Sequence, residues 1–380
     1  MQTLNLIAGF MVWVILSGLM PFIKQNVAMT AGQIAWVTAV PVVLGSLLRV
    51  PIGYYANRFG ARIVFAVSFL ILILPVYLIS IAHSFWELVI GGFFLGISGA
   101  VFSVGVTSLP KYYPAHRHGF INGVYGMGNI GNAVTTFFAP VIATRYGWPT
   151  TVRWFIVLLL VFIVLTLLLG DRREKRIKTP VMTQIKEVYK NPQLWLFSLF
   201  YFITFGSFVA FTVYLPNFLV SQFHLTKIDA GFRTAGFIVV ATLLRPVGGF
   251  LSDRYNPFKV LMFVFAGLTV AGIVLSFRPT IELYTFGCLL VAFCAGIGNG
   301  AVFKVVPLYF TRQAGFVNGL VAAFGGLGGF FPPLLLTIIH SLTGNYAVGF
   351  MALSEFAFGS FVIAAWLYFQ AKKIPVTKDA

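Results

Sequence analysis

The chain has 380 residues, of which 59% are hydrophobic and only 9% are charged, and its mean hydropathy is +0.93. A soluble domain carries about 25% charged residues, so this composition excludes a soluble globular protein and predicts a polytopic membrane protein. The net charge of +17 does not indicate nucleic acid as a partner. The Lys and Arg residues lie in short runs between apolar stretches, where they set topology and attract anionic membrane lipid.

Apolar stretches of spanning length follow one another along the chain. Because about 20 mostly apolar residues cross a bilayer, we expect an all-α polytopic membrane protein with twelve transmembrane helices. The expected spans are residues 4–23, 31–56, 63–81, 85–109, 120–143, 153–169, 194–220, 230–252, 260–277, 282–310, 316–340 and 347–370.

A polar interval divides these spans into two sets of six. We predict an N-terminal six-helix bundle at 1–170, a cytoplasmic linker at 171–192, a C-terminal six-helix bundle at 193–371 and a cytoplasmic tail at 372–380. Most of the 26 Lys and Arg residues fall on the side that holds both termini and the linker. The positive-inside rule therefore predicts that both termini are cytoplasmic.

The two halves repeat each other. LLRVPIGYYANRFG at 47–60 matches LLRPVGGFLSDRYN at 243–256, and the same offset relates GFING at 119–123 to GFVNG at 315–319. A third pair, GAVF at 99–102 and 300–303, has nearly that offset. Two pseudo-symmetric halves of like orientation predict a substrate site between them, exposed alternately to each side by rocking.

Two arginines lie inside predicted spans at equivalent positions, Arg49 and Arg245. Each costs about 2.5–3.5 kcal/mol at a helix centre on insertion scales. Snorkelling to the inner headgroups explains one such residue, but it does not explain the same LLR at the same depth in both halves. Since no carboxylate is placed to neutralise both, we expect a bound anion. Paired guanidinium donors suit a small flat oxyanion such as nitrate or nitrite.

Lys304 and Glu355 are further charges in predicted spans, and Glu355 is the only acid deep in one. The pKa of a buried lysine can fall, so Lys304 could carry a coupled proton or supply a third positive charge. The alternatives are an ion pair with Glu355 and a contact with a carbonyl group.

Glycine-rich stretches mark the fifth and eleventh spans, as GVYGMGNIGNA at 123–133 and GGLGG at 325–329. Glycine allows close helix packing and also allows the backbone to approach a small ligand. Asn129 and Asn132 in the first stretch need hydrogen-bond partners.

The loops after the second and eighth spans resemble the loop signature of the major facilitator superfamily. The first copy holds Gly53, Asn57 and Arg58, with Asn where Asp is usual, and the second holds Gly249, Asp253 and Arg254. In the family this loop clamps neighbouring helices and gates the inner side. The departure at Asn57 puts the first-half clamp in doubt.

More narrowly, the glycine stretches and GIGNGAVFKVVP at 296–307 resemble the signature helices of the nitrate/nitrite porter family, including bacterial nitrate transporters and nitrite-extrusion proteins. The resemblance covers nearly the whole chain. It implies nitrate or nitrite transport across a bacterial cytoplasmic membrane by alternating access. It leaves nitrate/nitrite exchange and proton-coupled uptake open.

The resemblance also implies roles for single residues. Arg49 and Arg245 would clamp the anion, Asn129 would hydrogen-bond it, Tyr201 and Phe205 would line the cavity, and Phe102 and Phe303 would stack on the flat anion. The sliding glycine faces would be formed by Gly126, Gly128, Gly131, Gly325, Gly326 and Gly328.

Other classes of protein fit less well. The five histidines lie near span ends, and no nucleophile or metal spacing is visible, so we expect neither an enzyme nor a metal or cofactor. The two-half repeat favours a carrier over an anion channel. The remaining alternative is a major facilitator carrier of another small organic anion. We expect a monomer, with nitrate, nitrite, membrane lipids and, if uptake is proton-coupled, protons as partners.

Overall fold

The computed structural model describes residues 1–114, 117–176, 181–277, 280–310 and 314–373. Because lipid offers no hydrogen bonds to the backbone, apolar segments of this kind must form helices. In chain order the helices are α1 (Gln2–Trp13), α2 (Ile15–Asn26), α3 (Ala31–Leu47), α4 (Arg49–Phe59), α5 (Ala61–Ser80), α6 (Phe85–Leu95), α7 (Ile97–Ala100), α8 (Phe102–Ser108), η1 (Leu109–Lys111), α9 (His118–Gly126), η3 (Met127–Asn129), α10 (Ile130–Tyr146), α11 (Trp148–Leu169), α12 (Val181–Val188), α13 (Pro192–Phe223), α14 (Lys227–Arg254), α15 (Pro257–Ser276), α16 (Ile281–Tyr309), α17 (Ala314–Leu327), α18 (Phe331–Thr343) and α19 (Ala347–Lys373).

Within the described ranges, ten helical stretches are long and apolar enough to cross a membrane. An eleventh is the pair α3 and α4, which is bent by 44°. The segment expected to be the fifth span consists of α9, η3 and α10, interrupted by the 3-10 turn at Met127–Asn129. The all-α polytopic fold class is confirmed. Residues 374–380 of the predicted tail lie outside the described residues.

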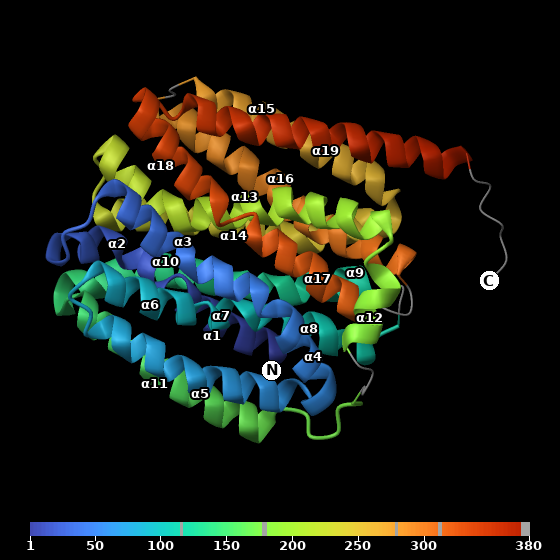
Figure 1. Cartoon of the computed structure of the whole chain (residues 1–380), viewed down its shortest axis with the longest axis horizontal. Helices are drawn as coiled ribbons and strands as arrows, with labels where there is room; N and C mark the ends of the chain where they lie inside the picture. Colours follow the sequence, from blue (N-terminus) through green and yellow to red (C-terminus); the bar gives the residue numbers. More distant parts are fainter. Residues whose placement is uncertain (115–116, 177–180, 278–279, 311–313, 374–380) are drawn as a thin grey trace.

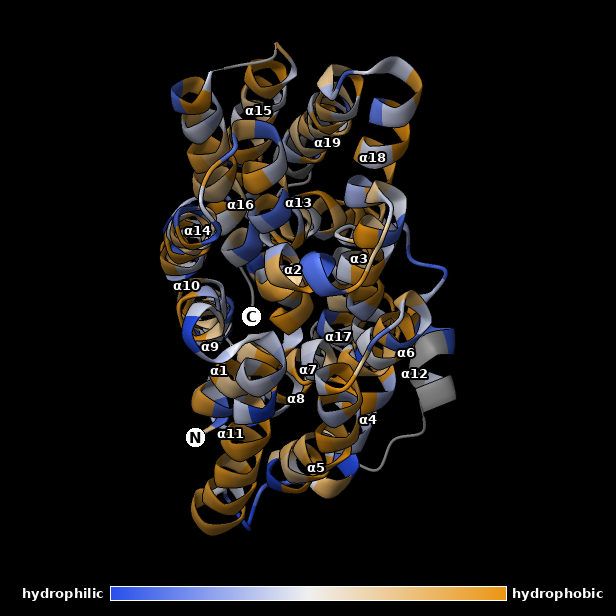
Figure 2. Cartoon of the chain, turned by 90° about the vertical axis from the view of Figure 1, so that its left-hand side faces the viewer, coloured by the Kyte–Doolittle hydropathy of each residue, from blue (hydrophilic) through white to orange (hydrophobic). Residues whose placement is uncertain are grey.

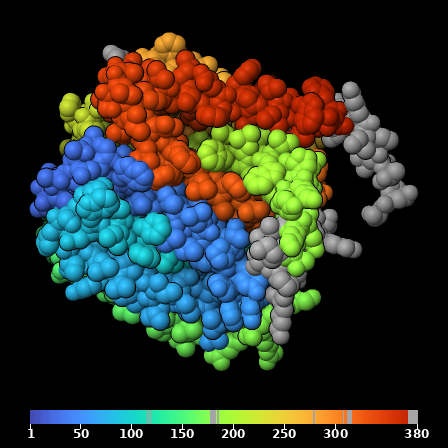
Figure 3. Space-filling view, viewed as in Figure 1, coloured from blue at the N-terminus to red at the C-terminus, as the bar shows by residue number. Residues whose placement is uncertain are grey.

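The two halves pack side by side: in Figure 1, α5 and α11 of the first half lie at the bottom, α15 and α19 of the second half lie at the top, and α17 reaches down beside α8. They meet through α10 on α14, α2 on α13, α9 on α14 and α16, and α17 on α3, α4 and α8. The space-filling view shows these halves in close contact over the face that it presents (Figure 3). The N-terminal Gln2 donates to Ser108 at the end of α8, so the first helix begins at the end of the molecule that also carries η1 and α12.

Burial differs sharply between inner and outer helices. The α1–α2 and α13 stretches are each 83% buried within their most apolar windows, whereas α11 is 22% and α19 is 28% buried. The outward faces carry large apolar side chains such as Leu169, Trp154, Phe356 and Trp366, and Figure 2 shows apolar colouring over these peripheral helices. An apolar exterior of this kind fits a lipid environment.

Several helices that line the centre are interrupted there. Val14 separates α1 from α2, Leu48 separates α3 from α4, and Val101 separates α7 from α8. Such breaks are tolerated at membrane depth where they are buried in protein or line a cavity. Two of them place the first residues of α4 and α8, Arg49 and Phe102, at the middle of the molecule.

Glycine fixes the contact between α14 and α16. A Cβ at Gly248 would lie 2.0 Å from the carbonyl oxygen of Ile297, and a Cβ at Gly300 would lie 2.1 Å from the carbonyl oxygen of Arg245. Because these neighbours are backbone atoms, they can move only if the helices separate.

Gly248→Ala should therefore destabilise the protein by about 1–3 kcal/mol, the usual cost of overpacking. The measurement is the thermal unfolding midpoint in detergent. Gly236→Ala on the same helix is the matched control, since a Cβ there meets nothing within 4 Å. Equal midpoints for the two variants would contradict the tight α14–α16 contact.

Candidate functional site

Two buried arginines, one from each half, share one aromatic ring. Arg49 is 0% and Arg245 is 2% exposed. The guanidinium carbon of Arg49 lies 4.9 Å from the centroid of Phe205, and that of Arg245 lies 5.1 Å from the same centroid. The structure thus brings the two predicted arginines together at the interface between the halves, around a ring carried by α13. Cation–π attraction offsets part of the like-charge repulsion.

Most of the guanidinium donors are unused by the protein. Nη1 of Arg49 donates to the carbonyl oxygen of Ala322 on α17, in the other half. The Nε and Nη2 atoms of both arginines are buried and have no hydrogen-bond partner among the described residues. Buried charged donors without partners are costly. The arrangement is therefore suited to an anion that accepts hydrogen bonds from both groups.

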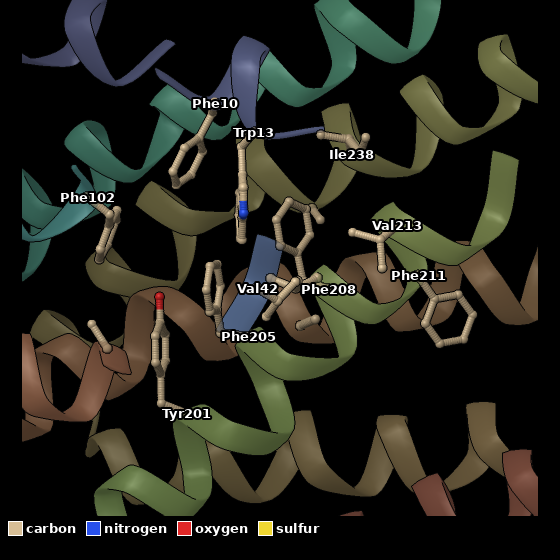
Figure 4. Packing of buried hydrophobic residues seen from close by; sticks show 14 of the residues in the cluster. Phe10, Trp13, Val42, Phe102, Tyr201, Phe205, Phe208, Phe211, Val213 and Ile238 are labelled. Carbon is tan, nitrogen blue, oxygen red and sulfur yellow. The ribbon is translucent and has the colours of Figure 1, made fainter. Parts of the chain in front are cut away.

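Aromatic side chains enclose this arginine pair. The ring of Tyr201 stacks on Phe205 with 4.9 Å between centroids and meets Phe303 edge-on at 4.8 Å. Phe102 lies 6.0 Å from Phe303 and 6.3 Å from Phe205. Figure 4 shows Tyr201, Phe205 and Phe208 along one helix, with Phe102 nearby on another element. All four predicted aromatic residues thus lie in one cluster, which excludes water and strengthens electrostatic attraction.

Two signature glycines, Gly126 and Gly326, each lie against the arginine of the opposite half. A Cβ at Gly126 would lie 2.9 Å from Nη1 of Arg245. A Cβ at Gly326 would lie 2.2 Å from the hydroxyl of Ser46 and 3.4 Å from the guanidinium carbon of Arg49. These glycines leave the room that each guanidinium occupies.

The other signature glycines lie against the protein's own packing surfaces. Gly325 lies against the ring of Tyr201, and Gly128 lies against Leu6. A Cβ added at Gly131 would lie 2.1 Å from the carbonyl oxygen of Ile7, and one added at Gly328 would lie 2.2 Å from the carbonyl oxygen of Phe202. Their evident role is close helix packing.

Asn129 is fully buried, and its side-chain amide donates to the carbonyl oxygen of Gly126. Its Oδ1 atom has no partner in the described part of the chain. It therefore lies one turn from a glycine that contacts Arg245, while its own hydrogen bond goes to the helix backbone.

Sequence reasoning missed a set of buried polar groups that repeats between the halves. Each has at least one side-chain polar atom without a hydrogen-bond partner in the described ranges. At the offset that relates Arg49 to Arg245 they form the pairs Ser46 and Thr242, Ser103 and Asn299, and Asn122 and Asn318. The repeat was the signal that could have found them, since each lies in or beside a repeated segment.

Lys304 lies beside the second gating loop, not at the arginine pair. Its ammonium forms an ion pair with the carboxylate of Asp253, and the two side chains are 18% and 24% exposed. Its aliphatic chain also packs close to Gly119. The alternative of an ion pair with Glu355 is wrong, because Glu355 lies on the exposed face of α19. Asp253 was a closer partner because it lies on α14, which packs along α16.

The two gating loops are built differently. In the second half, Gly249 packs against the backbone of Gly119, and Asp253 pairs with Lys304; Arg254 stacks on Tyr255. In the first half, Gly53 packs near Thr107. The buried Oδ1 of Asn57 has no partner among the residues described.

Arg58, in the first loop, donates a hydrogen bond to Tyr54 of its own helix and lies over the ring of Phe59. A narrow crevice runs from Arg49 to Asn57 and is lined also by Phe316 and Gly319.

Glu174, in the predicted linker, supplies a carboxylate to the first half. Its Oε2 accepts from the backbone N–H of Ala61, and its Oε1 pairs with Lys111 at 2.8 Å. A hydrogen bond from Tyr112 lowers the pKa of Asp171 in the same linker. The first-half clamp therefore has a carboxylate that sequence reasoning did not assign to it, although it does not contact Asn57.

An apolar cavity of about 290 Å³ does not include the arginines. It lies between α13, α18 and α19 and is lined by apolar side chains such as Phe211, Leu336 and Phe350. We place the candidate site at the arginine pair because charge and unpartnered donors converge there, whereas an apolar cavity offers no group to recognise an ion.

Gly126→Ala should displace Arg245 and weaken anion binding about ten-fold or more, because a Cβ 2.9 Å from Nη1 leaves no room for the present position. The measurement is the rise in thermal unfolding midpoint on titration with sodium nitrate. Gly359→Ala, where a Cβ meets nothing within 4 Å, is the control. An unchanged nitrate dependence in Gly126→Ala would contradict this placement of the site.

Known proteins share this architecture. The sequence profile described as Major Facilitator Superfamily matches residues 3–333 and 198–380. Two solved structures have the same fold: a human organic anion transporter, MFSD10 (TETRAN), with a TM-score of 0.73 and 14% identity, and a bacterial homologue of the human lysosomal transporter Spinster, with a TM-score of 0.69 and 18% identity. They cover 96% and 98% of this chain, which in turn covers 97% and 95% of theirs.

Closer relatives exist at the level of sequence. The chain is 63% identical over 372 residues to the nitrite extrusion protein of Bacillus subtilis (strain 168), covering 98% of this chain and 94% of that protein. It is 51% identical over 356 residues to the probable nitrate transporter NarT of Staphylococcus epidermidis, covering 94% of this chain and 92% of that one. The relatives bear the names of transporters, in keeping with the expectation that this chain is not an enzyme.

Proposed function

The chain belongs to the major facilitator superfamily and, within it, to the nitrate/nitrite porter family, and from this premise we propose that it exchanges nitrate for nitrite by alternating access. The observation that carries the proposal is the pair of buried guanidinium groups around Phe205, with Nε and Nη2 of both arginines unpartnered in the described chain. Nitrate and nitrite are small planar anions with two or more acceptor oxygens, which match forked guanidinium donors.

Charge favours exchange over net flux. With no anion between them, Arg49 and Arg245 repel each other in a region of low dielectric constant. A bound anion relieves this repulsion only where both arginines contact it, which is when the two halves have closed around it. It therefore stabilises the closed state selectively, as alternating access requires. The empty carrier changes state slowly, so the outward and return steps both need an anion.

The position of Lys304 also supports exchange. A coupling group should change its protonation together with substrate binding, yet Lys304 is paired with Asp253 beside the loop. We assign the pair to the clamp that holds α14 and α16 at that end. Glu355 lies on the exposed face of α19, away from the arginine pair. We further propose a multi-pass location in the bacterial cytoplasmic membrane with both termini cytoplasmic and with the protein acting as a monomer.

Counterflow in proteoliposomes tests the exchange. We expect labelled nitrate to enter rapidly when vesicles contain nitrite, and about 100-fold more slowly when they contain only sulfate, because the empty carrier returns slowly. Since both anions carry one negative charge, an imposed membrane potential should not change the rate. Rapid nitrate entry without internal nitrite would contradict exchange.

The arginine assignment is tested in the same vesicles with Arg245→Lys, which keeps the charge and loses the fork. We expect about 100-fold slower exchange, equivalent to about 2.7 kcal/mol. Arg233→Lys, an exposed arginine on the same helix, is the matched control. Competition by formate and oxalate separates this function from carriage of a small organic anion.

Lys304→Gln and Asp253→Asn should have the same effect, because each breaks the same ion pair. We expect both to slow exchange several-fold in either direction, without altering its dependence on a pH gradient. Uptake is measured with internal nitrite at equal and at unequal pH. A pH-gradient-driven nitrate uptake that is present in the wild type and lost only in Lys304→Gln would instead establish Lys304 as a proton-coupling group.

A further inference from the structure

At the end of the molecule opposite α12, two lysines bridge the halves. Lys24, near the end of α2, donates to Oδ1 of Asn217 on α13 at 2.8 Å. Lys227, the first residue of α14, donates to Oε1 of Gln25 on α2 at 2.5 Å. One lysine comes from each half, and each reaches across to the other. Figure 2 looks onto this end and shows α2 lying beside α13 and α14.

Both acceptors are neutral amides. Lys24 and Gln25 are consecutive on α2, so the two cross-half bonds start from neighbouring residues, and Lys227 is close enough to act electrostatically on Lys24. Lys227 also lies over the ring of Phe22, with Nζ 4.1 Å from the centroid. Neither lysine has a carboxylate partner within the described residues, whose ion pairs are Lys111–Glu174, Arg233–Asp229 and Lys304–Asp253.

The opposite end uses a different chemistry. There, lysines Lys111 and Lys304 are neutralised by Glu174 and Asp253. The amide-bonded end thus keeps two positive charges without a carboxylate beside them, and its cross-half bonds are weaker than ion pairs would be. Both lysines are only partly buried, so an anion arriving from solution can reach them. An anion accepts a hydrogen bond from an ammonium group more strongly than a neutral amide does.

We propose that Lys24 and Lys227 form an outer binding station for the small monovalent oxyanion, ahead of the arginine pair. The anion replaces Asn217 and Gln25 as acceptor of the lysine hydrogen bonds. It leaves the lysines when it passes on to the arginine pair. Lysine suits a station that must release its ligand, since it binds as a point charge without the fork of arginine. This inference rests on the proposed function and orientation.

The charge of the station is tested with Lys24→Gln, Lys227→Gln and the double variant, in right-side-out proteoliposomes containing nitrite. We expect the KM for external nitrate to rise about ten-fold in the double variant, with kcat nearly unchanged, because the lysines act on arrival of the anion. The dependence of KM on ionic strength should weaken as well. Lys24→Arg, which keeps the charge, should have the same KM as the wild type.

Arg145→Gln is the matched control, since Arg145 is an exposed cation at the end of α10, at the same end of the molecule. If it raises KM as much as the lysine variants do, the net charge of the surface acts and the station does not exist. Unchanged KM in the double variant, with fold and expression verified by the thermal midpoint, would also overturn the proposal.

The neutral acceptor is tested with Gln25→Glu. A carboxylate would turn one cross-half bond into an ion pair and compete with the arriving anion. We expect a lower kcat and a higher KM for external nitrate, with nitrate still raising the thermal midpoint because the arginine pair is untouched. Wild-type kinetics in Gln25→Glu would overturn the role of the amide. Absence of nitrate transport by the wild type would instead overturn the proposed function itself.

Discussion

Burial of two permanently charged side chains around one phenylalanine ring is the constraint on which the rest of this molecule depends. Arg49 and Arg245 reach Phe205 from different halves, and neither can lose its charge at any ordinary pH. A protein that places them together must supply compensation. Here the protein supplies one carbonyl oxygen, from Ala322, and aromatic faces, and it leaves the other guanidinium donors without a partner. The positive charge is therefore fully compensated only when an anion binds, so anion binding can favour one conformational state over another.

The surrounding elements follow from that constraint. The breaks at Leu48 and Val101 bring Arg49 and Phe102 to the start of a helix at mid-molecule. Gly126 and Gly326 clear the space that the guanidinium groups fill. Close backbone contacts at Gly248 and Gly300 hold α14 against α16, so Arg245 lies on a tightly packed pair of helices. Arg49 instead follows the break between α3 and α4.

The sequence alone predicted much of this arrangement, and its failures have a common physical cause. Hydropathy predicted the spans, and the repeated LLR identified the arginines, because both signals are local or repeat at a fixed offset. The partner of Lys304 was not predictable, since Asp253 and Glu355 are equally acidic in the sequence and only the packing of α14 on α16 distinguishes them. Glu174 was hidden for the same reason. Its contact with Ala61 joins a linker to a helix far back along the chain, and no spacing rule relates the two.

Crosswise placement of the glycines has a consequence for how such a protein changes over generations. Gly126 borders the arginine of the second half, and Gly326 borders that of the first. Each half therefore carries one arginine, while the glycine that leaves space for that arginine lies in the other half. If the chain arose by duplication and fusion, the two copies could not change independently at these positions, because a substitution at the glycine of one copy alters the space available to the arginine of the other.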